Sequence, residues 1–463
     1  MSIGAVVMAA GQGTRMKSAL PKVLHEIAGR PLVAWVLDAL AGVKVDHTVV
    51  VVGHGADAVR GVLPAGCKVA LQREQHGTGH ATQVGLRVLD RSCDTVIVLS
   101  GDTPLLERDL LKGLVRTHRR AGRAATLVSA VLDDGSRYGR VIRGTTGVRI
   151  VEARDASATE LAVQEINAGL YVFDRAELER ALRRVGRDNA QGEVYLPDVL
   201  PLLNGPVGVM ISPDPDVVLG VNSRTDLAEC GAIIQDRLRE RLMVAGVGMP
   251  DPQAVYVDAD VTVGADTVLH PGTHLQGETH IGAGCQIGPN VVARNCIIGA
   301  GTTALFAHMS DSAIGASCQI GPFAYLRPGV TVDDGGKVGT YVEVKNTRIG
   351  KKAKVPHLSY IGDADIGDGT NIGAGNITAN YDGFRKHRTT IGAGVKTGSD
   401  CVFVAPVSIG DRAMTAAGSI LTHDVPAGAL GIARARQENL EGFTKRAEAK
   451  ARAAMKRDGK GSR

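Results

Sequence analysis

The chain has 463 residues, too many for one ordinary domain, so two or three domains are expected. Only 3% of the residues are aromatic, which leaves the core to aliphatic side chains. The chain has no run of eighteen apolar residues, and its first residues lack a charged start and a cleavage site. We therefore expect a cytoplasmic protein that does not enter a membrane.

The net charge of +5 comes from the C-terminal tail, where ten Lys and Arg face four Asp and Glu between Arg434 and Arg463. The tail has one aromatic residue, Phe443, and no nucleic-acid-binding fold around it, so we expect a solvated end and no nucleic-acid partner. The seven cysteines are widely spread and form no Cys-x-x-Cys pair, which argues against disulfides and a zinc site.

A buried strand is predicted at residues 3–10, and a glycine-rich loop follows it. Gly11 and Gly13 allow backbone N–H groups to approach an anion, and Arg15 and Lys22 add positive charge. The loop lacks the Gly-Lys-Ser/Thr of a Walker motif and the third glycine of the dinucleotide fingerprint. It predicts a phosphate site of another kind, although a bare Gly-x-Gly is as often a structural turn.

Further strands at 48–52 and 95–99 alternate with helical segments at 32–40 and 81–89. This alternation predicts an open α/β sheet, in which ligands bind beyond the carboxyl ends of the strands. Asp102 occupies such a position. A loop Asp more often caps a helix or faces solvent, but here it is a candidate metal ligand.

The longer string Ala9-Ala10-Gly11-Gln12-Gly13-Thr14-Arg15-Met16, with Leu20-Pro21-Lys22-Val23-Leu24 after it, resembles the signature of sugar-1-phosphate nucleotidylyltransferases. The resemblance implies a Rossmann-like nucleotidyltransferase domain that uses UTP and Mg²⁺. It also implies a uracil-recognition loop at residues 72–80. The residues that it assigns to the nucleotide and the sugar phosphate are Ala9, Ala10, Gly11, Gly13, Lys22, Gln72, Gly77, Thr78, Ser100, Gly101, Asp102, Gly139, Glu152, Asn167 and Asn222.

The chemistry of this implied site follows from charge. A sugar 1-phosphate must attack the α-phosphorus of a nucleoside triphosphate, and both partners are anions. Catalysis then consists of positioning and charge neutralisation by Mg²⁺, Arg15 and Lys22. One carboxylate and one amide, Asp102 and Asn222, would hold the metal together with phosphate oxygens and water.

The segment from Thr225 to Ala245 predicts an amphipathic helix, which Gly246, Gly248 and Pro250 end. We interpret it as the connector between two domains. The expected domains are therefore a uridylyltransferase domain at 1–225, a linker helix at 226–248, an acetyltransferase domain at 249–436 and a basic tail at 437–463.

Between Val263 and Ile420 an aliphatic residue followed by Gly keeps returning, often at intervals that are multiples of six. This repeat fits a solenoid of short flat strands whose aliphatic residues point inward. A flexible Gly-rich linker would lack the periodic Ile and Val. The hexapeptides resemble the left-handed parallel β-helix, and the resemblance implies a trimer.

An interruption between Ile372 and Ile391, filled by residues 376–386, breaks the repeat. A long loop leaving a regular solenoid is more often functional than decorative. Nearby, His357 is the candidate general base for acetyl transfer to an amine, because an imidazole titrates at about pH 6.5. Most of the thirteen histidines must be surface or structural residues, so His357 depends on its context.

The string from Pro356 to Asp363 closely resembles the acetyltransferase motif of the bacterial bifunctional N-acetylglucosamine-1-phosphate uridylyltransferases and glucosamine-1-phosphate N-acetyltransferases. The resemblance covers residues 4 to about 440, and the basic tail after Arg446 departs from it. It implies acetylation of glucosamine 1-phosphate by acetyl-CoA, then uridylyl transfer to N-acetylglucosamine 1-phosphate. The product, UDP-N-acetylglucosamine, is a precursor of bacterial cell-wall polymers.

At the second site the resemblance implies shared sites between neighbouring chains of a homotrimer. It assigns the acceptor to Arg327, Lys345, Tyr360 and Asn371, and acetyl-CoA to Ala374, Asn380, Tyr381, Ser399, Ala417 and Arg434. Backbone N–H groups near the interruption could hold the oxyanion.

Three alternatives stay open at this point. The first is a single nucleotidylyltransferase whose β-helix only oligomerises or regulates, as in pyrophosphorylases of storage-sugar metabolism. The second is a regulatory scaffold that keeps both folds without chemistry, against which the intact charged residues argue. The third is a solenoid enzyme of the carbonic anhydrase type with zinc between chains, suggested by the histidines at positions 270, 274, 280 and 308.

Overall fold

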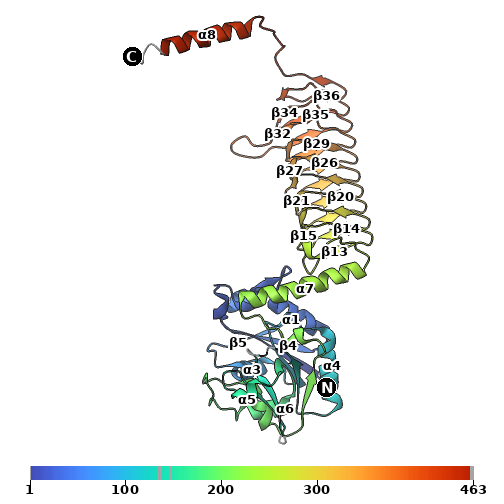
Figure 1. Cartoon of the computed structure of the whole chain (residues 1–463). Coiled ribbons are helices and arrows are strands. Elements are labelled where there is room, and N and C mark those ends of the chain that lie inside the picture. Colours follow the sequence, from blue (N-terminus) through green and yellow to red (C-terminus); the bar gives the residue numbers. More distant parts are fainter. Residues whose placement is uncertain (1, 134, 136–137, 145–146, 459–463) are drawn as a thin grey trace. The chain divides into compact units, whose positions relative to one another are not determined.

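The computed structural model describes residues 2–133, 135, 138–144 and 147–458 (Figure 1). It contains two compact units, residues 1–280 with 292–295 and residues 281–291 with 296–463. The last five residues of the predicted basic tail lie outside the described residues.

A mixed nine-stranded β-sheet forms the centre of the first unit (Figure 1). The strand order is β11-β7-β10-β6-β1-β4-β5, and β8 pairs with β10 and β9 beside this path. Strands β1, β4, β5 and β6 are mutually parallel, whereas β10 is antiparallel to β6 and β7. The bounds are β1 Ser2–Ala9, β4 His47–Val52, β5 Lys68–Leu71, β6 Cys93–Ser100, β7 Ala125–Val131, β8 Arg140–Gly144, β9 Gly147–Val151, β10 Glu165–Asp174 and β11 Val207–Ile211, with the small pair β2 Glu26–Ile27 and β3 Arg30–Pro31.

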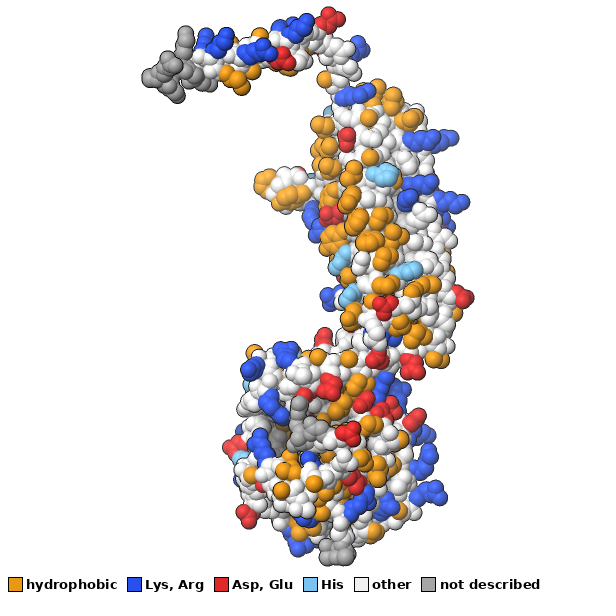
Figure 2. All heavy atoms as spheres, in the orientation of Figure 1, with side chains coloured by type: hydrophobic (Ala, Val, Ile, Leu, Met, Phe, Trp, Pro, Cys, Tyr) orange, Lys and Arg blue, Asp and Glu red, His pale blue; other side chains and the backbone are white. Residues whose placement is uncertain are grey.

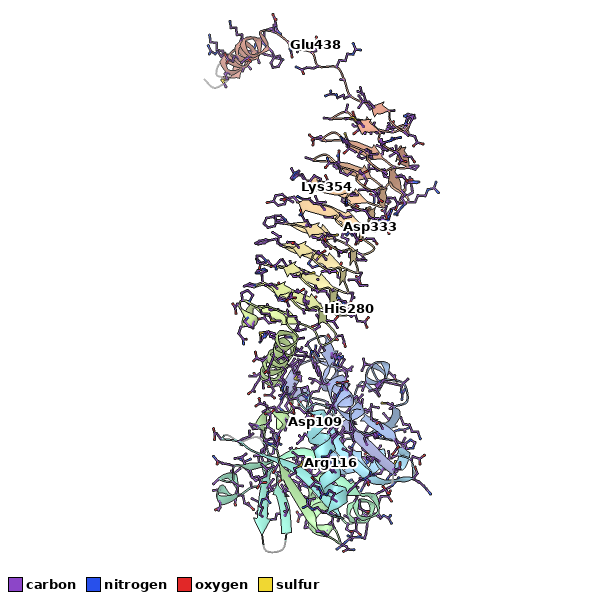
Figure 3. The ribbon with its side chains drawn as sticks, turned by 90° about the vertical axis from the view of Figure 1, so that its right-hand side faces the viewer. Asp109, Arg116, His280, Asp333, Lys354 and Glu438 are labelled. Carbon is purple, nitrogen blue, oxygen red and sulfur yellow. The ribbon has the colours of Figure 1, made fainter. Side chains whose placement is uncertain are left out.

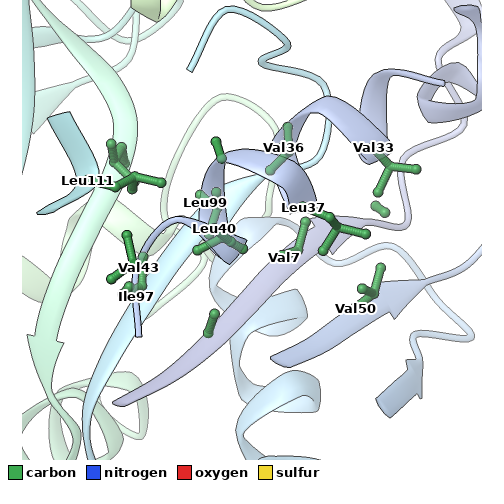
Figure 4. Packing of buried hydrophobic residues seen from close by; sticks show 14 of the residues in the cluster. Val7, Val33, Val36, Leu37, Leu40, Val43, Val50, Ile97, Leu99 and Leu111 are labelled. Carbon is green, nitrogen blue, oxygen red and sulfur yellow. The ribbon is translucent and has the colours of Figure 1, made fainter. Parts of the chain in front are cut away.

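Helices cover both faces of this sheet, because neighbouring residues of each strand point to opposite faces. Val7 and Ile97 pack with α1 and α4 on one face (Figure 4). Their neighbours Val6 and Val96 pack with α3 and α6 on the other face. The helix bounds are α1 Leu32–Ala41, α2 Ala56–Gly61, α3 Thr78–Val88, α4 Arg108–Arg120, α5 Ala158–Leu161, α6 Arg175–Leu182 and α7 Arg224–Val244. Burial on both faces explains why the strands are apolar throughout.

The predicted strands at 3–10, 48–52 and 95–99 correspond to β1, β4 and β6, and the predicted helices at 32–40 and 81–89 correspond to α1 and α3. The predicted helix after Thr225 is α7, which begins one residue earlier. A capping box explains its start, because Ser223 and Asp226 satisfy each other's backbone N–H groups.

Parallel sheets of short strands form the repeat region. The first unit holds its beginning, where β12, β15 and β18 pair in parallel. In the second unit the strands continue as three stacks, whose orders are β21-β24-β27-β30-β32-β34-β37, β19-β22-β25-β28-β31-β33-β35 and β17-β20-β23-β26-β29. The chain visits the three stacks in turn, as a β-helix with three faces requires.

The strands of the repeat are two to four residues long. Their bounds are β12 Val255–Val257, β13 Thr262–Val263, β14 Val268–Leu269, β15 Thr273–Gln276, β16 His280–Ile281, β17 Gln286–Ile287, β18 Val292–Arg294, β19 Ile297–Ile298, β20 Thr303–Ala304, β21 Ala307–Ser310, β22 Ala313–Ile314, β23 Gln319–Ile320, β24 Ala324–Leu326, β25 Thr331–Val332, β26 Lys337–Thr340, β27 Glu343–Lys345, β28 Arg348–Ile349, β29 Lys354–His357, β30 Tyr360–Gly362, β31 Ala364–Ile366, β32 Ile377–Ala379, β33 Thr389–Ile391, β34 Val402–Val404, β35 Val407–Ile409, β36 Met414–Thr415, β37 Ile420–Leu421 and β38 Leu430–Gly431.

Most of the predicted inward aliphatic residues are buried in the coils, and Ile349, Ile361 and Ile366 have no exposed surface, whereas Val263 at the start of the repeat is half-buried. Polar residues such as Lys354 project outward from the coils (Figure 3). The Gly of the repeat is required by close backbone contact. A Cβ on Gly299 would lie 2.5 Å from the carbonyl carbon of Gly315 in the next coil.

The interruption of the repeat is shorter than the sequence indicated. Residues 377–379 form β32, which pairs with β30 and β34 and continues its stack. The projecting loop is therefore residues 380–388, visible beside β32 in Figure 1. The sequence misplaced its start because Ile377 points outward, so the aliphatic-Gly signal is absent from a strand that is present.

Helix α8, Phe443–Asp458, lies within the predicted basic tail, and its residues are exposed up to Arg457. None of the helices in the described part of the chain has the length and apolar character that crossing a membrane requires.

Candidate active sites

The first candidate site lies at the sheet edge where β1, β4 and β6 end. The register places Ala9 beside Val52 and Met8 beside Ser100, so the segments after these strands leave the sheet together. Because β10 is antiparallel to β6, its beginning, with Asn167, belongs to the same edge. The topology thus gathers the predicted residues that follow three separate strands.

The two glycines of the first loop have different surroundings. Gly13 has a φ of +63°, and a Cβ there would lie 2.6 Å from the Cβ of Lys22, so glycine is required. Apart from Gly11 and its two chain neighbours, no described residue has an atom within 4 Å of the place where a Cβ on Gly11 would be. The backbone at Gly11 therefore faces open space.

Lys22, Asp102 and Asn222 converge on one point. The Lys22 ammonium donates to the Asp102 carboxylate and, at 3.0 Å, to the Asn222 side-chain oxygen. Ser100 Oγ donates to the other carboxylate oxygen of Asp102 at 2.5 Å. All three predicted residues are brought together, and two oxygen ligands face a single cation.

The start of α7 positions Asn222. Its backbone N–H donates to the Asp226 carboxylate at 2.9 Å, as part of the helix cap. Its side-chain Nδ2 donates to the carbonyl oxygen of Gly220 at 3.2 Å, which turns the side-chain oxygen toward Lys22. Val221 N–H donates to the Asp102 carbonyl oxygen at 2.9 Å and ties this segment to the end of β6.

Burial alone would raise the pKa of Asp102. The neighbouring positive charge of Lys22 and the hydrogen bonds from Lys22 and Ser100 outweigh burial and hold this pKa below its ordinary value. The surroundings of Asp102 therefore favour the ionised form of its side chain. Arg15, by contrast, is exposed and has no hydrogen bond or ion pair with other described residues, so its role stays a prediction.

The predicted base-recognition loop leads into α3. Gly77 has a φ of +96°, and Gly79 N–H donates to the Val194 carbonyl oxygen at 2.8 Å. The Thr78 hydroxyl accepts from Leu196 N–H at 3.0 Å. Gln72 is buried, and its side-chain nitrogen lies 3.0 Å from His80 Nδ1. The loop is thereby fixed to the segment around residues 194–196.

The predicted sugar contacts also lie together. Asn167 N–H donates to the Gly139 carbonyl oxygen at 2.8 Å, and a Cβ on Gly139 would lie 3.2 Å from a Glu152 carboxylate oxygen. Burial, then the charges of Asp198 and Asp155, raise the pKa of Glu152. Sequence reasoning missed this pair of aspartates, because nothing in their spacing connects them with Glu152.

The second candidate site lies on the stack that contains β24, β27 and β30. The register places Lys345 opposite Gly362 in the next coil. Arg327 follows β24 in the preceding coil, and its backbone N–H donates to the carbonyl oxygen of Val344, the residue before Lys345. The Arg327 guanidinium donates to Glu343 at 3.0 Å. A Cβ on Gly362 would lie 2.5 Å from the Tyr360 hydroxyl, so this glycine makes room for it.

Asp363 is the centre of this site, and sequence reasoning missed its role. It accepts hydrogen bonds from the side-chain amides of Asn346, at 2.6 Å, and Asn380, and its carboxylate lies 3.9 Å from the Lys345 ammonium. Burial opposes ionisation, but the two amides and the charges of Lys345 and Lys386 lower the pKa of Asp363.

Lys386 of the projecting loop also belongs to this site. Its ammonium lies beside Lys345, which lowers the pKa of Lys386, while Asp363 and Tyr360 oppose that effect. The Asp382 carboxylate shapes the loop by accepting from the N–H groups of Phe384 and Arg385, each at 2.8 Å. A sequence signal existed, because the only long interruption of the repeat carries Lys386.

His357 and Asn371 lie in a different stack from Lys345. His357 ends β29, and Asn371 pairs with Lys354 of that strand and with Lys396. The His357 ring is exposed and has no hydrogen bond to other described residues. One chain therefore places its predicted base on a different stack from Lys345 and Tyr360, and only Asn371 of the predicted acceptor residues shares the stack of His357.

Three of the predicted acetyl-CoA residues stack in successive coils. Asp400 N–H donates to the Ala374 carbonyl oxygen, and Gly418 N–H donates to the Ser399 carbonyl oxygen, each at 2.8 Å. Ala417 precedes Gly418, so Ala374, Ser399 and Ala417 form one strip. Asn380 is buried against Asp363, whereas Tyr381 and Arg434 are exposed. Within one chain, the described ranges hold no group of three His, Cys, Asp or Glu that could bind a metal, and a zinc site between chains is not tested by this.

Comparisons with known proteins agree with both halves of this description. The model of the MobA-like NTP transferase domain matches residues 5–191, and the model of the bacterial transferase hexapeptide, six repeats, matches residues 260–295. The bifunctional protein GlmU of Streptomyces avermitilis is 48% identical over 95% of this chain and 94% of its own length. Those of Brevibacillus brevis, 47% identical over 94% and 96%, and Corynebacterium aurimucosum, 45% identical over 96% and 93%, are similar.

The chain belongs to the GlmU family. The expected fold, an α/β nucleotidyltransferase domain followed by a left-handed β-helix of hexapeptide repeats, is confirmed. The expected bifunctional transferase, with uridylyltransferase and acetyltransferase activities in the synthesis of UDP-N-acetylglucosamine, is confirmed by the same membership.

The pKa of Asp102, which burial raises and the interactions with Lys22 and Ser100 lower, gives a direct test of the first site. In Lys22→Met the ion pair is lost while burial persists, so the pKa of Asp102 should rise above its ordinary value. In the native protein the stabilisation due to ionised Asp102 is present above the pKa of an unfolded Asp and is lost as the pH falls through the lower, folded pKa. NMR titration of labelled Asp carboxyl carbons measures the shift. The exposed neighbour variant Lys17→Met should leave this pKa unchanged, and an unchanged pKa in Lys22→Met would contradict the balance.

Proposed function

We propose that the edge formed by β1, β4 and β6 is the uridylyltransferase site, and that the cluster of Lys345, Asp363 and Lys386 is the acceptor part of the acetyltransferase site. The observation that carries the first assignment is the convergence of Lys22, Asp102 and Asn222 beyond the strand ends. The second assignment rests on two ammonium groups and a fixed carboxylate beside the projecting loop.

In the first site, a phosphate oxygen of N-acetylglucosamine 1-phosphate attacks the α-phosphorus of UTP, and the bond to pyrophosphate breaks. The open backbone at Gly11 and the charges of Arg15 and Lys22 hold the triphosphate. Gly139, Glu152 and Asn167 hold the sugar, whose hydroxyl groups suit a carboxylate and an amide. Gln72, Gly77 and Thr78 hold the uracil. No residue of the chain forms a covalent intermediate.

Mg²⁺ fits the same site. Its ligands would be the Asp102 carboxylate and the Asn222 side-chain oxygen, hard oxygen donors that already face one cation, the Lys22 ammonium. When bound, the ion supplies neutralisation of phosphate charge. Lys22 then remains free to neutralise a second phosphate group.

In the second site, the amine of glucosamine 1-phosphate attacks the thioester carbon of acetyl-CoA, so a C–N bond forms and the C–S bond breaks. His357 takes the proton that the ammonium must lose, and the thiolate of coenzyme A is the leaving group. Arg327, Lys345 and Lys386 attract the sugar phosphate, and Tyr360 and Asn371 orient the sugar. The strip of Ala374, Ser399 and Ala417, flanked by Asn380, Tyr381 and Arg434, accommodates acetyl-CoA.

The chain acts as a homotrimer in this proposal. An apolar stripe runs along one corner of the second unit, and its members share a positive φ: Phe306, Phe323, Tyr341 and Leu358. Left-handed backbone costs a non-Gly residue roughly 1–2 kcal/mol, yet the last three side chains are more than half exposed. Hydrophobic side chains gather on the face shown in Figure 2. Neighbouring copies that cover the stripe would offset both the cost of the left-handed backbone and the cost of exposing apolar side chains to water. His357, which adjoins Leu358, then faces a neighbour's acceptor residues.

The finer domain limits belong to this proposal: a uridylyltransferase domain to residue 225, the linker helix to 248, the acetyltransferase domain to 436 and the basic tail beyond it. The cytoplasm is the proposed location, because UTP and acetyl-CoA are intracellular substrates and none of the seven cysteines forms a disulfide.

A one-pot assay with glucosamine 1-phosphate, acetyl-CoA, UTP and Mg²⁺ tests both site assignments. The native protein should form UDP-N-acetylglucosamine. His357→Ala should form it only when N-acetylglucosamine 1-phosphate is supplied, and Asp102→Ala should accumulate that intermediate. Mass spectrometry measures each product. Full acetylation by His357→Ala would overturn the proposed base.

The metal assignment predicts that the two activities respond differently to chelation. Removal of Mg²⁺ should abolish uridylyl transfer and leave acetyl transfer unchanged, because the proposed Mg²⁺ ligands belong to the first site. Asn222→Ala should raise the Mg²⁺ concentration needed for half-maximal uridylyl transfer, since it removes one ligand. Titration of activity with Mg²⁺ gives that concentration, and an unchanged value would contradict the assignment.

The trimer is tested by placing a charge in the apolar stripe. Tyr341→Glu should dissociate the protein in sedimentation velocity and lower acetyl transfer at least about tenfold, because burying an unpaired charge is costly. Uridylyl transfer should persist, since the first site lies within one chain. Lys351→Glu, exposed and outside the stripe, is the control and should stay trimeric. A trimeric Tyr341→Glu would show that the stripe is not the interface.

A further inference from the structure

The side chain of Gln72 is held in one orientation by two groups of its own loop. Its Nε2 lies 3.5 Å from the Gly77 carbonyl oxygen and 3.0 Å from His80 Nδ1. A carbonyl oxygen can only accept, so the nitrogen end of the amide faces these groups. The opposite end, Oε1, has no hydrogen bond to other described residues.

His80 reaches Gln72 because of its place in α3. The helix begins at Thr78, and Gly77 before it adopts a left-handed φ, so His80 lies in the first turn and faces back toward the end of β5. The Gln72 backbone is fixed as well, since its N–H donates to the Val52 carbonyl oxygen at 2.8 Å. The Gln72 carbonyl oxygen accepts from Gln75 Nε2 at 3.3 Å. With the backbone fixed, the contact of the amide nitrogen with His80 opposes rotation of the amide.

His80 accepts this hydrogen bond only when Nδ1 carries no proton. Burial, then the positive charges of His76, Arg87 and Arg187, lower the pKa of His80, and a hydrogen bond with the Glu74 backbone opposes them in part. The Glu74 carboxylate of the same loop is bonded to His76, at 2.7 Å. The environment thus favours the neutral ring that can accept.

The two pyrimidine bases differ at the atoms that an amide would meet. Uracil carries a hydrogen at N3 and is a donor there, whereas N3 of cytosine is an acceptor. An amide that can rotate freely accommodates either base by exchanging its oxygen and nitrogen. An amide whose nitrogen is held by the protein presents only its oxygen, and an oxygen that faces N3 accepts a hydrogen bond from uracil but is repelled by N3 of cytosine.

We propose that His80 is a positioning residue that sets the base specificity of the uridylyltransferase site by holding Gln72 with Oε1 toward the base. This inference rests on the proposed function of Gln72 as a contact of the uracil. His80 touches no reacting atom. Its effect is on the selection between UTP and CTP, and not on the transfer step.

Two substitutions distinguish the effect of the hydrogen-bond acceptor of His80 from the effect of the volume of its ring. His80→Phe keeps an aromatic ring without an acceptor, and His80→Asn replaces the ring by a short amide whose oxygen can stand near the place of Nδ1. The ratio of kcat/KM for UTP to that for CTP should fall on the order of tenfold in His80→Phe, because a tenfold change corresponds to the free energy of one neutral hydrogen bond. The fall should appear in KM, with kcat for UTP nearly unchanged. His80→Asn should keep the native ratio.

The control variant is His47→Phe, at the start of β4 and the opposite end of the strand from the site, which should keep the native ratio. Acetyl transfer measured on each variant reports whether the rest of the chain is intact. A native ratio in His80→Phe, or an equal loss in His80→Phe and His80→Asn, would overturn the positioning role.

Gln72→Ala separates this inference from the function on which it rests. If Gln72→Ala loses the preference for UTP while His80→Phe keeps it, Gln72 contacts the base but His80 does not orient it. If Gln72→Ala keeps the preference, the proposed base contact itself is wrong, and this inference fails with it.

Discussion

The second half of the protein depends on the stacking of backbone on backbone in the coils. At Gly positions such as Gly299, successive turns approach so closely that no side chain fits. A Cβ there would lie only 2.5 Å from the carbonyl carbon of Gly315. Inside, residues such as Ile349 and Ile366 are fully buried on one another. This regularity fixes which residues become neighbours: whatever the repeat places at one position of a coil lies beside its equivalent in the next. Lys345 and Gly362 meet for this reason, without any adaptation of either side chain.

The second candidate site lies where the regular stacking of the coils brings residues together and where the projecting loop interrupts it. Asp363 has a left-handed backbone at a corner of the coil, and its carboxylate is bonded by Asn346 from the coil before and Asn380 from the coil after. The projecting loop adds Lys386, a charge that a plain coil could not bring to the same place. Two like charges side by side are unfavourable alone. The Asp363 carboxylate beside them offsets part of this repulsion, and the anionic acceptor proposed above would offset more.

The sequence predicted the fold well because both halves have strong periodicity. Strands buried on both faces and the aliphatic-Gly repeat each constrain many residues at once, so β1, β4 and β6 and the inward Ile residues were identified. The gathering of Lys22, Asp102 and Asn222 could be anticipated only through the resemblance, since 200 positions separate Lys22 from Asn222. Asp363 and Lys386 were missed because their roles depend on which coil lies next to which. Strand β32 was missed because its outward Ile377 lacks the repeat's signal.

The two sites differ in what holds them together. At the first, one chain supplies the ion pair, the helix cap that orients Asn222 and the loop that carries Gln72, so its geometry is set by folding alone. At the second, one chain places His357 and Lys345 on different stacks and leaves Tyr341 and Leu358 exposed in strained conformations. Burial of these apolar side chains by association, as proposed above, would offset the cost of exposing them. If the proposed trimer forms, acetyl transfer is a property of the assembly, whereas the first candidate site is set by the folded chain alone.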